Sequence, residues 1–122
     1  MQNLINWFEI PAKDFKRAVS FYKAILEVEV HEMEMFGTKM GLFPTDGKNV
    51  SGAIVQGDDY TPSTDGVLAY LNGGKDLQNV LNKIEKNSGK VIVPKTQISP
   101  EMGYFGMFID TEGNKMAVHS IQ

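Results

Sequence analysis

Few side chains in this 122-residue sequence belong to the types that usually carry out chemistry. The chain has two histidines, His31 and His119, and no cysteine, so thiol nucleophiles, thiolate metal ligands and disulfides are excluded. An imidazole is close to half protonated near neutral pH and can exchange protons with a carboxylate such as that of Glu9. Glu9 and His119 are therefore the candidate catalytic residues, on condition that the fold brings them together. The sequence contains no glycine-rich nucleotide motif and no Ser-His-Asp pattern.

The first half of the chain predicts one helix and four strands. Residues 4–10 are rich in β-branched and aromatic side chains and end at Pro11, which predicts a strand. Residues 13–26 carry apolar side chains at intervals of three and four, as in an amphipathic helix, and Asp14 is placed to cap its first turn. Three short segments separated by turn residues predict an antiparallel meander: residues 28–35, 38–43 and 51–56.

A polar segment with Gly and Pro, residues 57–66, precedes a second run of the same pattern. This run predicts a strand over 67–72, a helix over 75–87, and strands over 90–94, 104–110 and 115–120. Residues 111–114 form a short turn, whereas residues 95–103 predict a loop long enough to cover a neighbouring site.

The two halves match residue by residue at a nearly constant spacing. Asp14 aligns with Asp76 at the helix starts, and Trp7 aligns with Leu68 in the first strands. A repeat of this length indicates two copies of a βαβββ unit, where a ferredoxin-like fold would require the order βαββαβ. We therefore predict an α+β fold in which two modules form a curved, partly open barrel-like sheet around a cleft. The expected organisation is a single domain over 1–122, with module one at 1–57, a linker at 58–66 and module two at 67–122.

Seven short segments carry a family resemblance: FEIP (8–11), DFKRA (14–18), FY (21–22), PK (94–95), GYF (103–105), FIDTEGN (108–114) and AVHS (117–120). In these segments, which span essentially the whole chain, the sequence resembles the vicinal oxygen chelate superfamily. That superfamily includes glyoxalase I, bleomycin-resistance proteins and extradiol dioxygenases. The resemblance implies a homodimer whose paired modules enclose clefts, and the short linker would permit the two chains to exchange modules.

The resemblance also implies where metal ligands would lie. Metal-dependent relatives use His, Gln or Glu at positions that correspond here to Trp7, Leu68 and Ala117, with a fourth at or beside Ile54. None of these side chains can ligate a divalent cation, which needs several nitrogen or oxygen donors. We therefore expect no metal at the family position and no cofactor.

Alternation along the strands adds a polar neighbour to each of these four positions. Glu9 accompanies Trp7, Tyr70 accompanies Leu68, His119 accompanies Ala117, and Gln56 accompanies Ile54. The expected ligand-binding residues are Trp7, Glu9, Gln56, Leu68, Tyr70, Ala117 and His119. A mostly apolar lining with a few polar groups suits an organic ligand.

The resulting hypothesis is a metal-free small-molecule-binding protein of the glyoxalase/bleomycin-resistance type. One alternative is a lyase or isomerase with a shifted metal site built from Glu9, His31 and His119, or with metal-free acid–base chemistry through Glu9 and His119. Another is a structural or regulatory protein whose cleft is vestigial. A net charge of −3 without a Lys/Arg cluster argues against nucleic acid as a partner, and no apolar run reaches the ~20 residues of a membrane span. The start of the sequence does not resemble a signal peptide, so we expect a cytoplasmic protein.

Overall fold

The computed structural model describes residues 3–122, in which the pattern βαβββ occurs twice. The elements of module one are β1 (Trp7–Pro11), α1 (Phe15–Leu26), β2 (His31–Met35), β3 (Thr38–Leu42) and β4 (Ser51–Gln56). Those of module two are β5 (Tyr70–Asn72), α2 (Gln78–Ile84), the 3₁₀ helix η1 (Glu85–Asn87), β6 (Lys90–Ser99), β7 (Gly103–Ile109) and β8 (Lys115–Ser120). The predicted α+β class is confirmed, and the ferredoxin-like order is excluded.

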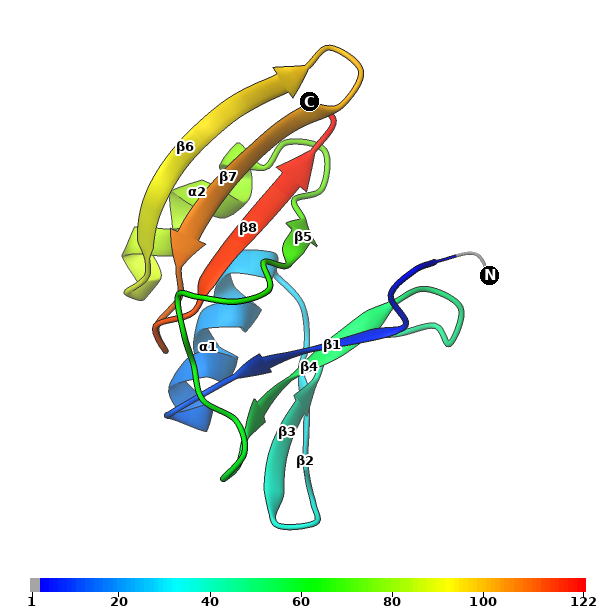
Figure 1. The fold of residues 1–122 in the computed structure, drawn as a ribbon, viewed down its shortest axis with the longest axis vertical. Helices are drawn as coiled ribbons and strands as arrows, with labels where there is room; N and C mark the ends of the chain where they lie inside the picture. The colour runs from blue at the N-terminus through cyan, green and yellow to red at the C-terminus, as the bar shows by residue number, and fades with distance from the viewer. Residues whose placement is uncertain (1–2) are drawn as a thin grey trace.

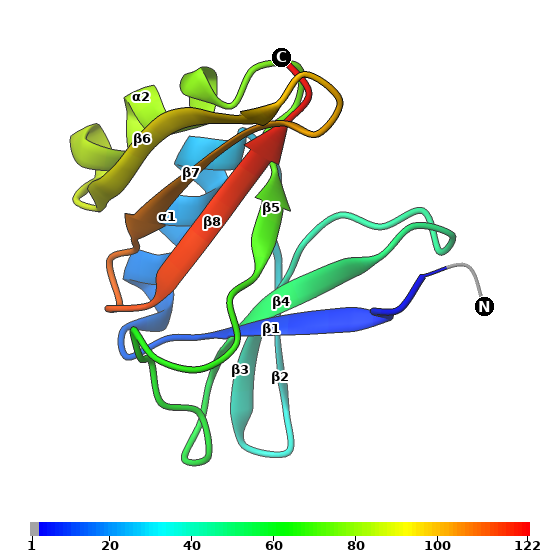
Figure 2. The same ribbon diagram turned by 45° about the horizontal axis from the view of Figure 1, so that its top comes forward.

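Each module forms its own four-stranded mixed sheet. The strand orders are β1-β4-β3-β2 and β5-β8-β7-β6, so the two sheets repeat one topology. In both sheets the first strand pairs in parallel with the last, and the other pairs are antiparallel. Figures 1 and 2 show that the sheets diverge and do not close into a barrel. β1 and β5 are edge strands of the two sheets, each hydrogen-bonded on one side only.

Helix α1 belongs to module one but packs against both modules. Its carboxylate cap is Asp14, which accepts a hydrogen bond of 3.2 Å from the backbone N–H of Arg17. Its apolar stripe is buried in one hydrophobic core that also includes residues of α2, β7 and β8. Within that core the rings of Phe21 and Phe108 lie 6.0 Å apart. The two modules of one chain are therefore held together by shared burial.

The turn at residues 110–114, between β7 and β8, adds a polar connection from module two to the start of α1. The carboxylate of Glu112 accepts hydrogen bonds from the backbone N–H groups of Lys13 at 2.8 Å and Asp14 at 2.6 Å. It also forms an ion pair with Arg17 at 2.7 Å, although the Glu112 side chain has no exposed surface. Tyr22 of α1 donates a 2.7 Å hydrogen bond to Asp110 in the same turn. This 110–114 turn fixes the orientation of module two relative to α1.

Several predicted boundaries differ from the structure, and in module one β1 and β2 each begin three residues later than predicted. The predicted loop over 95–103 is wrong, because β6 continues to Ser99 and only a tight turn precedes β7. Pro94 suggested the end of a strand, but β6 is an edge strand with bulges around this residue, where a proline is tolerated. α2 covers only the middle of the predicted helix 75–87, and η1 forms its last turn. β5 is shorter than the predicted strand 67–72.

In residues 3–122 the longest apolar helical stretch falls short of what a membrane crossing requires.

Candidate functional site

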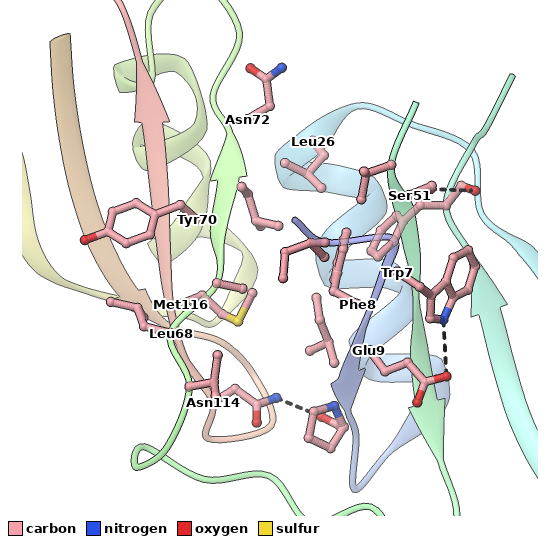
Figure 3. Close-up of a pocket in the computed structure, with 18 of the residues that line it drawn as sticks. Trp7, Phe8, Glu9, Leu26, Ser51, Leu68, Tyr70, Asn72, Asn114 and Met116 are labelled. Atoms are coloured by element: carbon pink, nitrogen blue, oxygen red, sulfur yellow. Dashed lines mark hydrogen bonds between the residues drawn. The ribbon is translucent and has the colours of Figure 1, made fainter. Parts of the chain in front are cut away.

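A groove of about 1000 Å³ lies between the two sheets, where β1 and β5 face each other. Figure 3 shows Trp7 and Glu9 on the wall formed by the first sheet, with Leu68 and Tyr70 on the opposite wall. Part of the linker also lines the groove, through Thr61 and residues 63 and 65. The linker is therefore part of the site and does more than connect the modules.

The back of the groove is apolar. It is lined by Phe8, Leu26, Phe43 and Met116, of which Phe8 and Phe43 stack with their ring centroids 6.0 Å apart. Phe8 points to the opposite face of β1 from Trp7, so side chains from both faces of this edge strand line the groove. Such a surface binds the apolar part of a ligand by removing it from water.

Trp7 and Glu9 line the groove on the side of the first sheet, and Tyr60 of the linker, which is not among the described lining residues, is hydrogen-bonded to Glu9. The indole N–H of Trp7 donates to Oε2 of Glu9 at 3.3 Å, and the hydroxyl of Tyr60 donates to Oε1 at 2.9 Å. The hydrogen bond to Glu9, together with the charge of that carboxylate, raises the pKa of Tyr60 above its ordinary value. The phenol therefore remains a donor at neutral pH. Trp7 keeps 43% of its surface exposed, so the indole is available to a ligand.

Sequence reasoning missed Tyr60, because the linker has no periodicity that could orient its side chains. It did predict that Trp7 and Glu9 share a face of β1, and the structure places them so. Leu68 and Tyr70 also share one wall of the groove. Tyr70 is 53% exposed and lies opposite Ala117 in the β5–β8 register.

His119 does not line this groove. It lies in a smaller hollow of about 680 Å³, together with Ile98, Met102 and Ile121. The Nε2 atom of His119 lies 2.6 Å from the carbonyl oxygen of Met102, so this nitrogen carries the proton and donates. Tyr70 borders both hollows. Among the hydrogen bonds of residues 3–122 none joins Glu9 to His119, and the predicted proton-transfer pair is not assembled.

Gln56 and Ile54 lie on the wrong face of β4 for the predicted site. Ile54 pairs with Ile10, and both are buried in the core. The side-chain oxygen of Gln56 accepts a 2.7 Å hydrogen bond from the backbone N–H of Phe15, so Gln56 supports the first turn of α1. Gln56 is not among the described residues that line the groove. Ala117 is fully buried and is not among the described residues that line either hollow.

The strand registers identify the fourth metal position more accurately. Ala117 lies opposite Tyr70, and in module one the residue opposite Glu9 is Ala53, next to Ile54. By this correspondence, the four positions that the family resemblance implies for metal ligands would carry Trp7, Leu68, Ala53 and Ala117. Their side chains offer a divalent ion no lone pair on nitrogen or oxygen, because the indole nitrogen is only a donor. These residues do not fit a metal centre.

The alternative metal site of Glu9, His31 and His119 is contradicted by the structure. Glu9 and His31 lie on opposite edge strands of the first sheet, and His119 belongs to the second sheet. Within residues 3–122 no three side chains of His, Cys, Asp or Glu come together in a metal-binding group.

The fold agrees with comparisons to known proteins. The chain belongs to the Glyoxalase/Bleomycin resistance protein/Dioxygenase superfamily, whose sequence model matches residues 4–118. A "Glyoxylase-like domain-containing protein" of Didymella fabae is 28% identical over 124 residues, covering 93% of this chain and 91% of that protein.

Solved structures with low sequence identity share the fold. TnmS3, an antibiotic binding protein from Streptomyces sp. CB03234, superposes with a TM-score of 0.66 at 18% identity, covering 97% of this chain and 95% of that one. The fosfomycin resistance protein FosX from Listeria monocytogenes superposes with a TM-score of 0.65 at 18% identity, covering 98% of this chain and 91% of that one. A glyoxylase/bleomycin resistance protein/dioxygenase domain from Frankia sp. EAN1pec gives 0.74 at 11% identity, covering 98% of both chains. At these identities the likeness concerns the fold alone.

Proposed function

We propose that this protein binds an organic, partly apolar small molecule in the groove between β1 and β5, without a metal ion at the family position. The observation that carries the proposal is the groove itself, about 1000 Å³ in volume and lined by an exposed indole, an aromatic back wall and a few polar groups. This combination is typical of small-molecule sites. An antibiotic binding protein is among the proteins of similar fold, which supports binding as the activity.

Among single residues, Trp7 is expected to contribute most to the free energy of ligand binding. An indole that is 43% exposed leaves roughly 100 Å² for a ligand to cover, taking ~250 Å² for the whole side chain. At ~25 cal/mol per Å², that burial contributes about 2–3 kcal/mol, which corresponds to roughly 30- to 160-fold in affinity. Costs of ordering the ligand lower this figure, so a loss of about tenfold on removing the indole is a reasonable expectation.

The test uses the fact that Trp7 is the only tryptophan of the chain. Freshly purified protein is first analysed by native mass spectrometry for a co-purified organic mass, and a panel of aromatic compounds is then titrated against Trp7 fluorescence. Binders are confirmed by calorimetry with Trp7→Ala, and with Ile92→Ala as the matched control, because Ile92 is 40% exposed on β6, which contributes no described lining residue to the groove. Binding that is unaffected by Trp7→Ala, or no binding at all, would refute the proposal.

We also propose that two chains associate and that the protein works in the cytoplasm. Phe36 and Met35 at the β2–β3 hairpin are large apolar side chains exposed to solvent, as are Leu4 and Ile5 before β1. Such residues favour a partner surface. Light scattering after size exclusion should give twice the mass of one chain, and a monomer at high concentration would contradict the dimer. Cell fractionation tests the compartment.

A further inference from the structure

Among residues 3–122, no cationic group forms an ion pair with the Glu9 carboxylate in the groove. The ion pairs of residues 3–122 involve other acids, namely Glu32, Glu112, Glu27 and Asp76. From the part of the chain that the structure describes, the Glu9 side chain accepts two neutral hydrogen bonds, from Trp7 and Tyr60, although a carboxylate has about four acceptor sites. These two donors orient the carboxylate on the groove wall and leave part of its acceptor capacity free.

The surroundings of Glu9 favour positive over negative charge in a ligand. The charged side chains that line the groove are Glu9, Asp65 and Lys115, so the acids outnumber the bases. An anion beside Glu9 would meet a like charge, and the nearest donors, the Trp7 indole N–H and the Tyr60 hydroxyl, are already bonded to Glu9. A group that can donate hydrogen bonds would find free acceptor sites instead.

Exposed aromatic surface lies in the same groove. Trp7 is hydrogen-bonded to Glu9 and is 43% exposed, whereas the Tyr70 ring lies on the other wall and points away from Trp7. The face of an aromatic ring attracts a cation, and tryptophan does so most strongly. A carboxylate beside an exposed indole thus offers an ammonium group two favourable contacts at once.

We infer that the ligand of this groove is an organic cation, with a flat apolar body against the Trp7 indole and an ammonium or amidinium group at Glu9. The inference rests on the proposed function, since it specifies the ligand of the same groove. It predicts a preference among ligands of one shape that differ only in charge.

The test uses three probes with one biphenyl body: 4-phenylbenzylammonium, 4-phenylbenzyl alcohol and biphenyl-4-carboxylate. Their affinities are measured at neutral pH by calorimetry and by quenching of Trp7. The ammonium probe should bind about tenfold more tightly than the alcohol, as expected for one partly exposed charge pair plus a cation–π contact, and the carboxylate should bind most weakly. Added salt should reduce the advantage of the ammonium probe.

Two variants locate the effect. Glu9→Gln keeps the size of the side chain and should remove the preference for the ammonium probe over the alcohol. Glu34→Gln removes the same charge from β2, the far edge strand of that sheet, and should leave the preference intact. Thermal unfolding of each variant verifies that it is folded.

The outcomes separate the two proposals. Equal affinities of ammonium and alcohol probes, a carboxylate that binds most tightly, or a preference that survives Glu9→Gln would overturn the cation inference while groove binding stands. If none of the probes binds, both the cation inference and the groove-binding proposal are refuted.

Discussion

Replacing Glu112 with Gln should strongly destabilise the protein, because this side chain joins module two to the start of α1. The Glu112 carboxylate is completely buried and accepts hydrogen bonds from two backbone N–H groups and from Arg17, at 2.6–3.1 Å, and one from the hydroxyl of Thr111 at 2.8 Å. A Gln at this position keeps the shape but loses the charge and turns an N–H₂ group toward donors. Charge-assisted bonds contribute ~1.5–3 kcal/mol each and are not additive, so we expect a loss of about 2–4 kcal/mol in the free energy of unfolding.

This loss is large relative to the ~5–15 kcal/mol of a typical domain, and it corresponds to a fall of roughly 10 °C in Tm. Urea unfolding followed by circular dichroism measures the change. The matched control is Glu32→Gln, which breaks an ion pair with Lys16 on the surface and should cost less than about 0.5 kcal/mol. A loss below about 1 kcal/mol for Glu112→Gln, or an equal loss in the control, would show that the 110–114 turn does not hold the modules together.

The same variant should change the response to acid. Burial raises the pKa of Glu112, but the hydrogen bond from Arg17 and those from Asp14, Thr111 and Lys13 outweigh burial and hold this pKa below its ordinary value. A carboxyl whose pKa is lower in the folded state stabilises the protein above the unfolded-state pKa, which is about 4.3. That stabilisation is lost as the pH falls through the folded-state pKa. Below about pH 4.5 the wild type should therefore lose stability more steeply than Glu112→Gln.

Three further predictions concern other parts of the fold. Burial, followed by the charge of Asp110, raises the pKa of Tyr22 well above its ordinary value, so the free energy of unfolding should fall as the pH rises above about 10. Tyr22→Phe should flatten this alkaline loss, which urea titrations at several pH values would measure. At neutral pH the same change should lower the free energy of unfolding by about 1–2 kcal/mol, because it removes the hydrogen bond to Asp110. Gly103→Ala should lower the free energy of unfolding by more than about 3 kcal/mol, because a Cβ at its φ of 85° meets the backbone of β8. Gly37 has a φ of 75° in open space, so Gly37→Ala should lower it by only about 1 kcal/mol, and thermal unfolding compares the two variants. Gln56→Leu should lower the free energy of unfolding by about 1–2 kcal/mol, because it leaves the backbone N–H of Phe15 without an acceptor. Calorimetry should nevertheless find the preference for the ammonium probe over the alcohol unchanged.

Local patterns predicted those elements whose environment is set by their own sequence. α1 has an unbroken apolar stripe and a capping Asp14, and the predicted helix differs from it by two residues at the start. β4 is buried on both faces and matches the prediction at both ends. β6 was truncated in the prediction because Pro94 suggests a boundary, and only the sheet order reveals that the strand lies at an edge.

The candidate site was predictable only within single strands. The shared face of Trp7 and Glu9 follows from alternation over three residues, and the structure confirms that geometry. The place of Gln56 was inferred across the whole meander by pseudo-symmetry, where an error of one residue moves a side chain to the other face of the sheet. Tyr60 lies in a segment without periodicity, and nothing in the sequence indicates that its hydroxyl reaches Glu9.

The groove and the 110–114 turn are mechanically linked through Asn114. Its side-chain N–H₂ donates to the carbonyl of Pro11 at the end of β1, at 2.7 Å, and its side-chain oxygen accepts from the backbone N–H of Ser63 in the linker, at 3.2 Å. Asn114 also lines the groove. Because the turn that holds α1 thus also positions β1 and the linker wall, loosening the turn should widen the groove without altering the charge at Glu9. In Glu112→Gln, calorimetry should therefore show weaker binding of both ammonium and alcohol probes by a similar factor, whereas Glu9→Gln should change only their ratio.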